Sequence, residues 1–394
     1  MSPDQLAING ASPVTEDSVP FHRPSVGKQE AEYAKKSIES RYVVGPGPYC
    51  KKVEEHVEDE WNIPRALTVT SCTHAMELAL ICAEVEQEDE IIVPSFTYVS
   101  TAQAVLRAGA TPVFADVDPE TLTLTPETLN DALTDRTRGV IMVHYGGFPG
   151  PVQSIQEFCE DNNLFCVEDA AQVYDTKRDG NMAGTVGRFG CISFHGTKAI
   201  TSGEGGLLVI NNEEDVARCE MIRDKGTDRS QTRLGDVDRY TWRTVGSSYV
   251  LSDILGAVLW KQIERWPKIR KRRREVQNVI RSGLEKIDTD NKYDVLYPPE
   301  NCRENGLLTA LLLDDSDRRD WLLEALQAEG IQAREHYHPL HETPYAQENL
   351  DVPDSLPGTE RISSSITRIP AHPEMDDDDI ENTLKALRKV YTHI

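Results

Sequence analysis

The chain has 394 residues, a formal net charge of −24 and a hydrophobic fraction of 39%. This length and composition predict a globular protein with two or three domains, or one large domain with a smaller one. A surface this acidic repels nucleic acid and anionic membranes, so we expect neither as a partner.

The first 18 residues are polar and lack a basic end followed by an apolar core, so we expect a disordered leader over residues 1–18 and no secretory signal. No run of about 18 apolar residues follows, which predicts no transmembrane helix. The eight cysteines include no CxxC pair, which argues against a disulfide scaffold and favours a reducing cytoplasm. The acidic balance suits either a salt-adapted cytoplasm or an ordinary acidic enzyme.

Residues 66–211 alternate between helical stretches and short apolar strands. Strands that alternate with helices imply a mainly parallel sheet covered by helices on both faces, so we expect an α/β fold. The expected strands are EIIVP, TPVFADV, RGVIMVHY, NLFCVEDAA, CISFH and GGLLVIN.

A second helical pattern begins near Ser252 and runs past Pro267 into the basic stretch KIRKRRREV, residues 268–276. A proline inside a helix is a common place for a chain to leave one domain for the next. We therefore expect a large domain over residues 19–266 and a smaller C-terminal α/β domain over residues 267–394. We interpret the basic stretch as the solvated face of a long helix.

Charged side chains follow two strands of the predicted sheet, at the edge where open α/β sheets bind their ligands. Glu168 and Asp169 end an apolar strand, and Lys198 follows the strand CISFH. A carboxylate in this position is either a ligand group or a satisfied structural cap, and a lysine among glycines is usually solvated. A partly buried lysine, however, can lose its proton at modest cost and act as a nucleophile toward aldehydes.

Two further groups at the same edge have the chemistry of a ligand site. Ser71, Cys72 and Thr73 precede a helix, and hydroxyls with backbone N–H groups at a helix start form an anion cradle. Tyr98 follows the strand EIIVP, where its ring could cover a planar heterocycle. A phosphate cradle, an aromatic lid, a carboxylate and a lysine, in that order, fit pyridoxal 5′-phosphate.

Several longer stretches resemble signatures of the DegT/DnrJ/EryC1/StrS family of sugar-nucleotide aminotransferases, and the resemblance extends from Val19 to Ile394. The signatures are VPSFTYVSTA, VEDAAQ, SFHGTKAITSGEGG and HYHPLH. This family has the pyridoxal-phosphate-dependent transferase fold type I, similar to aspartate aminotransferase, with a large, mostly parallel-sheet domain and a smaller C-terminal α/β domain. Within the family, SCTHAMELA, IRDKGTDRSQ and VDRYTWRTVGSSYVLSD most resemble the dTDP-4-amino-4,6-dideoxygalactose transaminases.

The resemblance implies a role for each matching residue. Lys198 would be the Schiff-base lysine and the proton shuttle, and Asp169 would pair with the pyridine nitrogen. The remaining contacts to the cofactor would come from Gln172 on the ring oxygen, Tyr98 stacked on the ring, Thr73 and Ser193 on the phosphate, and the backbone N–H of Cys72.

The resemblance also implies a homodimer with shared active sites, in which Ser248 completes the phosphate site of the neighbouring subunit. Many members of the family have GxNYR there, whereas this chain has GSSYV, so Ser248 replaces Asn. The substrate would contact Asn305, His336 and His341. The stretch around Asn305 lacks the His and aromatic residues that the family often has at these positions. We expect no metal site, because Pro339 interrupts the spacing of these histidines.

The resemblance therefore implies an aminotransferase that converts a nucleotide-linked 4-keto-6-deoxyhexose, expected to be dTDP-4-keto-6-deoxyglucose, to the 4-amino sugar with glutamate as amino donor. Lys198 favours transamination, because the members of the family that catalyse dehydration have histidine in its place. One alternative is a different keto sugar nucleotide, either a 3-keto sugar or the GDP-linked perosamine type. The other is a non-catalytic relative, which the presence of Lys198, Asp169 and Gln172 disfavours.

Overall fold

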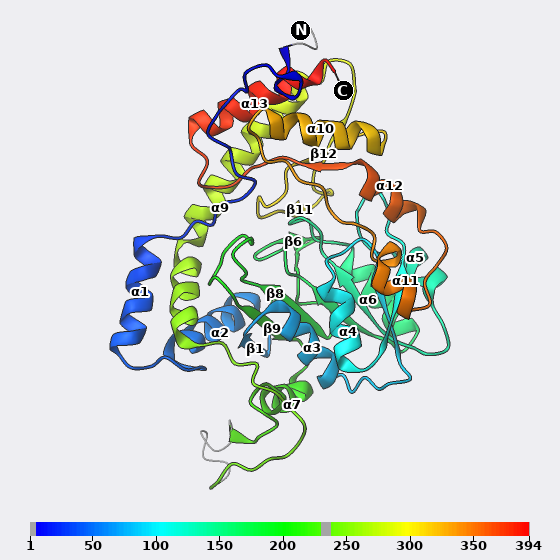
Figure 1. Ribbon diagram of the computed structural model, residues 1–394. Helices are drawn as coiled ribbons and strands as arrows, with labels where there is room; N and C mark the ends of the chain where they lie inside the picture. Colours follow the sequence, from blue (N-terminus) through cyan, green and yellow to red (C-terminus); the bar gives the residue numbers. More distant parts are fainter. Residues whose placement is uncertain (1–4, 230–237, 394) are drawn as a thin grey trace.

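The computed structural model of the chain describes residues 5–229 and 238–393, and the structural statements below refer to these residues. Residues 1–4, 230–237 and 394 lie outside the described part, which therefore includes the stretches IRDKGTDRSQ and VDRYTWRTVGSSYVLSD only incompletely. Figure 1 shows one large sheet in the lower part of the molecule, with a smaller layer of helices and strands above it.

The large sheet has seven strands in the order β1-β9-β8-β5-β4-β2-β3. From β3 to β8 neighbouring strands are parallel, and β9 pairs antiparallel with both β8 and β1. This arrangement confirms the mainly parallel α/β fold expected from the sequence. The strands are β1 (Arg65–Val69), β2 (Glu90–Pro94), β3 (Thr111–Ala115), β4 (Thr137–Val143), β5 (Phe165–Asp169), β8 (Phe189–Ser193) and β9 (Gly206–Ile210).

Helices cover both faces of this sheet, because neighbouring residues of a strand point to opposite faces and both sets are apolar. On β9, Leu208 packs into the core cluster that includes α3, α4 and α7, whereas Leu207 packs into the cluster that includes α2 and α9. The helices around the sheet are α1 (Lys28–Glu39), α2 (Pro48–Trp61), α3 (Cys72–Cys82), α4 (Ser100–Ala108), α5 (Pro126–Ala132), α6 (Val152–Asp161), α7 (Glu213–Arg223) and α9 (Asp253–Ile287).

The long helix α9 connects the two parts of the molecule. It runs for 35 residues through Pro267 without ending, so the interruption that we expected there is wrong. Trp266 and Ile269 pack into the large-sheet core on either side of the proline and stabilise the helix across the missing N–H. Four residues of its C-terminal half, beginning at Val276, belong to a separate core. The division into residues 19–266 and 267–394 stays a prediction.

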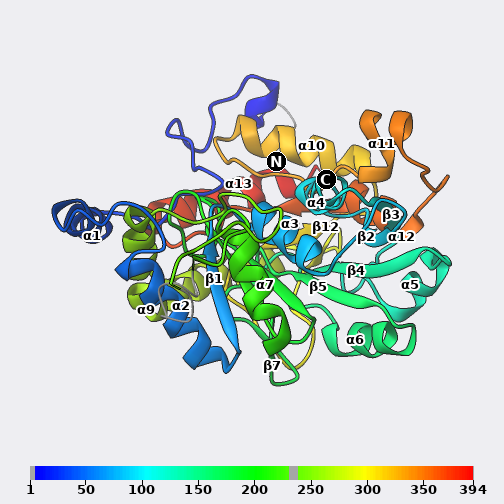
Figure 2. The ribbon, with the colours of Figure 1, turned by 90° about the horizontal axis from the view of Figure 1, so that it is seen from below.

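The upper layer is built around a three-stranded antiparallel sheet in the order β10-β12-β13. Figure 1 shows α9 running from beside α1 up to α13, and Figure 2 shows α1 projecting from the body of the molecule next to α9. No helix in the described part of the chain is long and apolar enough to cross a membrane. The remaining elements are η2 (Ala7–Asn9), β6 (Lys177–Arg178), β7 (Asn181–Met182), β10 (Asp294–Val295), β11 (Cys302–Arg303), β12 (Ala310–Leu312), α10 (Ser316–Ala328), η3 (Leu340–Glu342), α11 (Pro344–Asn349), α12 (Pro357–Ser365), β13 (Ile366–Arg368) and α13 (Asp377–Tyr391).

The described part of the expected leader, residues 5–18, is folded against the upper layer, which corrects the expectation of disorder. Leu6 is only 2% exposed and belongs to the core of this layer. The Glu329 carboxylate accepts hydrogen bonds from the backbone N–H groups of Ala7 (2.9 Å) and Val14 (3.0 Å) and pairs with the Lys389 ammonium (2.7 Å). The sequence suggested disorder because it is polar, and the buried acceptor that its backbone needs lies more than 300 residues away.

We predict that Glu329→Gln lowers the free energy of unfolding by about 1–3 kcal/mol, because the amide lacks the charge that pairs with Lys389 and with two partly buried N–H groups. Chemical denaturation measures this change, and limited proteolysis within residues 5–18 should become faster. Glu324→Gln, at an exposed position of α10, the helix that Glu329 follows, is the matched control and should change stability by less than about 0.5 kcal/mol. Equal stability of the two variants would contradict the anchoring role of Glu329.

Candidate active site

A cavity of about 560 Å³ opens where β4, β5 and β8 end. The last residues of these strands, Val143, Asp169 and Ser193, lie in its wall. The upper layer closes the opposite side with His336, Tyr337 and Arg368. The cavity therefore lies at the carboxyl edge of the parallel strands, as open α/β sheets predict. Of the residues selected from the sequence, it brings together Cys72, Thr73, Tyr98, Asp169, Gln172, Ser193, Lys198 and His336.

Asp169 presents a buried carboxylate to this cavity. Its side chain is 5% exposed; Oδ2 accepts a hydrogen bond from Thr101 Oγ1 (2.8 Å), and Oδ1 accepts one from the Ala171 N–H (3.2 Å). Burial raises the pKa of Asp169 above its usual range, against the opposing effects of these hydrogen bonds and of Lys198. Within the described residues no cationic group lies within 4.0 Å of the carboxylate. A buried carboxylate without a counterion favours a cationic ligand.

Lys198 faces the same cavity from the turn after β8. Its side chain is half-buried, and burial lowers the pKa of its ammonium, although Cys72 and Asp169 act in the opposite direction. Arg368 adds a smaller lowering effect by charge repulsion. The amine is therefore neutral over a wider pH range than that of an exposed lysine, as a nucleophile or a general base requires.

The glycines after Lys198 allow the backbone to pass close to the start of α3. A Cβ atom at Gly206 would lie 2.4–2.6 Å from backbone atoms of Ser71 and Cys72, which no real side chain tolerates. Gly203 has a φ of +90°, which is the left-handed region that glycine adopts without strain. These glycines therefore bring the lysine turn against the anion cradle predicted at residues 71–73.

The cradle itself consists of a capped helix start and several hydroxyl groups. Ser71 caps α3 by accepting a hydrogen bond from the His74 N–H (3.1 Å), and Thr73 Oγ1 donates to Ser100 Oγ (3.0 Å). Ser100 lines the cavity and was missed by sequence reasoning, although it belongs to the signature VPSFTYVSTA. Burial raises the pKa of the Cys72 thiol, so the thiol is protonated and unreactive.

Gln172 and Tyr98 occupy different depths of the cavity. Gln172 Oε1 accepts from the Gly146 N–H (3.0 Å), and its Nε2 donates to the Tyr337 hydroxyl (2.8 Å). The Tyr337 ring stacks on His336, with 4.0 Å between ring centroids. Tyr98 is 60% exposed at the rim. Gln172 therefore orients an aromatic wall, and Tyr98 remains available to cover a ligand.

Arg273 is a further site residue, and the interpretation of KIRKRRREV as a solvated face is wrong for it. Its side chain is 1% exposed; Nε donates to the Ala199 carbonyl and Nη2 to the Lys198 carbonyl, both at 3.2 Å. It lies on the buried face of α9 between Ile269 and Val276, at the helical spacing of three to four residues. That spacing is the signal that could have identified it, because Lys268, Lys271 and Arg274 are exposed as expected.

Three of the residues selected from the sequence do not line the cavity. His341 is buried and its Nδ1 contacts Ser95 Oγ (2.8 Å), so the expected substrate contact stays a prediction that this position does not support. Asn305 is also buried and donates to the Gln172 carbonyl (2.8 Å), and its expected substrate contact stays a prediction in the same way. Ser248 is exposed on the segment that pairs with Asp224, away from the cavity of its own chain.

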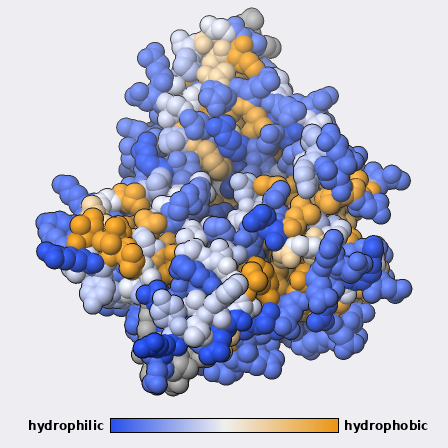
Figure 3. Space-filling view, turned by 60° about the horizontal axis from the view of Figure 1, so that its bottom comes forward, coloured by the Kyte–Doolittle hydropathy of each residue, from blue (hydrophilic) through white to orange (hydrophobic). Residues whose placement is uncertain are grey.

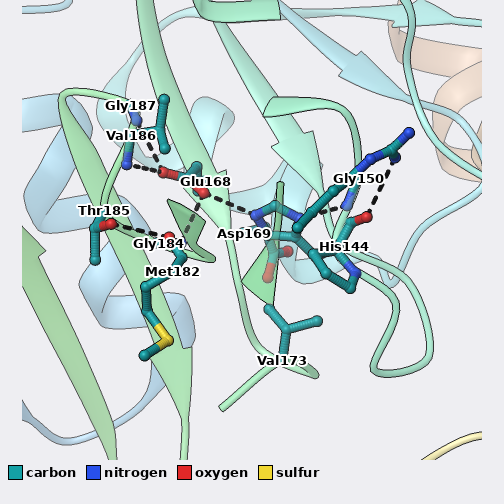
Figure 4. A network of polar contacts seen from close by, with 12 residues as sticks. His144, Gly150, Glu168, Asp169, Val173, Met182, Gly184, Thr185, Val186 and Gly187 are labelled. Carbon is teal, nitrogen blue, oxygen red and sulfur yellow. Dashed lines mark hydrogen bonds and ion pairs between the residues drawn. The ribbon is translucent and has the colours of Figure 1, made fainter. Parts of the chain in front are cut away.

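A carboxylate at the end of this strand was expected to be either a ligand group or a structural cap. Glu168 is the structural one, because its hydrogen bonds are to other groups of the protein. Figure 4 shows its carboxylate turned away from Asp169 and toward His144. The His144 Nδ1 accepts from the Gly150 N–H (2.9 Å), so Nε2 carries the proton that Glu168 accepts at 2.8 Å. Glu168 also accepts from the backbone N–H groups of Gly184 (2.7 Å), Val186 and Gly187 (both 2.8 Å).

Comparison with known proteins agrees with this geometry. The model of the DegT/DnrJ/EryC1/StrS aminotransferase family matches residues 24–388. GDP-perosamine synthase of Vibrio cholerae is 28% identical over 378 residues, which cover 95% of this chain and all of that protein. The structure of DesI with its TDP-sugar product has a TM-score of 0.88 at 26% identity and covers 100% of this chain and 97% of that chain. The aminotransferase TlmJ of Streptoalloteichus hindustanus has a TM-score of 0.87 at 27% identity, over 95% and 99% of the two chains.

These similarities confirm the family resemblance and fold type I, and pyridoxal phosphate is the cofactor of this family. The finer resemblance to dTDP-4-amino-4,6-dideoxygalactose transaminases is not reproduced, because the curated relative described above acts in GDP-perosamine synthesis. The family model matches most of the chain, and the cavity holds a lysine and a carboxylate at the expected strand ends. The chain belongs to the DegT/DnrJ/EryC1/StrS aminotransferase family.

Proposed function

We propose that the protein transfers an amino group from glutamate to the ketone of a nucleotide-linked 4-keto-6-deoxyhexose, with dTDP-4-keto-6-deoxyglucose as the expected substrate. The observation that carries this proposal is the pair Lys198 and Asp169, two groups of opposite charge that face one cavity and have no ion-pair partner among the described residues. The similarity to a GDP-perosamine synthase favours a second candidate, a GDP-linked keto sugar of the perosamine type.

The residues present fit pyridoxal phosphate. Asp169 offers a carboxylate without a counterion to the ring nitrogen, and Thr73 and Ser193 offer hydroxyl groups to the phosphate next to the start of α3. Lys198 offers an amine of lowered pKa to the aldehyde. When bound, this cofactor acts as an electron sink that stabilises negative charge on the carbon next to the amino nitrogen.

The side chains of this chain would carry the proton transfers. The neutral Lys198 amine would remove the proton from the α-carbon of the amino donor, and the ammonium that results would return it to the carbon on the other side of the amino nitrogen, two bonds away. Asp169 would keep the ring nitrogen protonated from within a buried, hydrogen-bonded position. Arg273 would fix the backbone from which Lys198 extends. Donor and acceptor would react in turn at the same lysine, which gives ping-pong kinetics.

We also propose that the protein acts in a reducing cytoplasm. All eight cysteines are free thiols, and seven of them are buried. Buried thiols of this kind pack as small apolar side chains and contribute no disulfide bond. This arrangement supports the compartment expected from the scattered cysteine positions.

We further propose a homodimer with shared active sites. Trp242 and Val245, on the segment that precedes Ser248, are each 78% exposed. Figure 3 shows a second apolar patch on the left, over α1 and the residues after it, where Ile38, Tyr42 and Val44 are exposed. Exposed apolar patches of this kind mark protein interfaces. A second subunit bound to these patches would lie next to Ser248, as the expected contribution of Ser248 to the other subunit's site requires.

The substrate proposal predicts turnover of at least one 4-keto-6-deoxyhexose nucleotide. Purified protein with pyridoxal phosphate and glutamate should convert it to the amino sugar, identified by mass spectrometry together with 2-oxoglutarate. A panel of dTDP-, UDP- and GDP-linked 4-keto sugars and a 3-keto sugar discriminates the candidates. Lys198→Ala should abolish both product formation and borohydride-trapped labelling by the cofactor, whereas Lys268→Ala, at an exposed position, should retain both. Absence of turnover with every 4-keto-6-deoxyhexose would refute the proposal.

The electrostatics of the site predict that Lys198 titrates below the usual range of a lysine. Competitive labelling of the cofactor-free protein with an acylating reagent across pH, followed by peptide mass spectrometry, measures the midpoint. Asp169→Asn should lower this midpoint further, because the carboxylate raises the pKa of Lys198 by favouring its charged form. Asp131→Asn, at an exposed position, is the control and should leave the midpoint unchanged. An upward shift in Asp169→Asn would contradict the charge coupling.

The dimer proposal predicts that a charge placed in the exposed apolar patches separates the subunits. Wild-type protein should be dimeric at micromolar concentration by sedimentation velocity, whereas the double variant Val44→Glu and Trp242→Glu should be monomeric and should bind pyridoxal phosphate more weakly. Lys51→Glu, on the exposed side of α2, is the control for added negative charge. A wild-type monomer, or a monomeric variant with unchanged cofactor affinity, would contradict shared sites.

A further inference from the structure

One guanidinium group in the wall of the cavity has no counterion among the described residues. Arg368 ends β13, its side chain is 7% exposed, and it lines the cavity together with Lys198 and Asp169. In the described ranges of the chain, no carboxylate lies within 4.0 Å of its nitrogen atoms, and its buried Nε has no hydrogen-bond acceptor. Its backbone is fixed by two hydrogen bonds with Arg334, of 2.7 and 3.0 Å. Arg368 is therefore a well-anchored cation with unused donors.

The side chains that touch Arg368 do not neutralise it. Its Nη1 lies 2.9 and 2.6 Å from the two ring nitrogens of His336, and its guanidinium lies over the Phe21 ring, 4.8 Å from the centroid. Burial and the charge of Arg368 lower the pKa of His336 to about 2, so the imidazole is neutral and offers a single acceptor. The positive charge therefore stays uncompensated.

The charge distribution of the cavity makes this arrangement unfavourable unless an anion binds. Arginine does not lose its proton in proteins, and an unpaired buried charge costs several kcal/mol. Three cationic side chains line the cavity, Lys198, Arg273 and Arg368. The acidic side chains in its wall are Asp169 and Glu204, and Glu204 is 67% exposed. The interior therefore has an excess of positive charge on the side formed by the upper layer.

We propose that Arg368 is an anion subsite that binds an oxyanion of a substrate through the fork of its guanidinium group. The proposal rests on the proposed function, in which two anionic substrates use one cavity in turn. The guanidinium fork matches the paired oxygens of a carboxylate or a phosphate group. The anion is thus either the carboxylate of the amino donor or the diphosphate of the nucleotide sugar. The predicted cradle for the cofactor phosphate is separate, because it lies at the start of α3 in the lower part of the molecule.

Binding measurements without turnover test this proposal. Titration calorimetry of the holoenzyme with 2-oxoglutarate reports the carboxylate arm, and titration with dTDP and GDP reports the diphosphate arm. Arg368→Met should weaken one of these ligands by at least about tenfold, as expected for the loss of a charged hydrogen-bonding group, and Arg368→Lys should weaken it less. The ligand whose affinity falls identifies the source of the anion: 2-oxoglutarate indicates the carboxylate of the amino donor, and dTDP or GDP indicates the diphosphate of the nucleotide sugar. Arg334→Met, at an exposed neighbouring position outside the cavity, should bind both ligands like the wild type.

Unchanged affinity for both ligands in folded Arg368→Met protein would overturn the proposal, and so would an equal loss in Arg334→Met. Circular dichroism and the cofactor absorbance verify folding. If Arg368→Met does not fold, Arg368→Gln replaces it, and the same loss of affinity is expected. No keto sugar is needed for these titrations. Loss of anion binding without turnover of any sugar in the panel would therefore refute the proposed function and leave the subsite in place.

Discussion

The site depends on a carboxylate that is buried at the end of β5 and has no counterion in the part of the chain that the structure describes. Asp169 can occupy this position only because the strand end around it is held by other bonds. The neighbouring Glu168 is fully buried on the opposite face and is bound by three backbone N–H groups and by His144. Because successive residues of a strand point to opposite faces, the anchoring of Glu168 directs Asp169 into the cavity. The hydrogen bond from Thr101 then fixes the carboxylate itself.

The remaining charges of the cavity are arranged around this anion. Burial favours the neutral form of Lys198, whereas Asp169 favours its charged form, so the lysine is held between the two forms that proton transfer requires. Arg273 contributes through hydrogen bonds to the backbone of the lysine turn, and Arg368 lies on the opposite wall with unused donors. Three basic side chains and one buried carboxylate therefore line the same cavity, and this excess of basic groups favours anionic ligands.

The long helix α9 connects the two layers that form the cavity. Its first half packs against the large sheet and its second half against the upper layer, and Arg273 lies between the two cores. The same helix therefore aligns the lysine turn with the wall that carries His336 and Arg368. The N-terminal segment adds Phe21 and His22 to the wall, and residues 5–18 are anchored on Glu329 in the upper layer.

The sequence by itself determined the α/β class, the family and the residues that end the parallel strands. Apolar runs followed by Asp169 and Lys198 are local patterns, and the carboxyl ends of parallel strands meet at one edge whatever the rest of the chain does. Only the tertiary structure decided the positions and the burial of Arg273, Arg368, Asn305 and His341. Arg273 lies in a basic stretch and His341 in a polar stretch, and such local sequences are typical of exposed residues. Their surroundings come from segments far apart in the chain, because burial and charge balance are set by the atoms that surround a side chain in space.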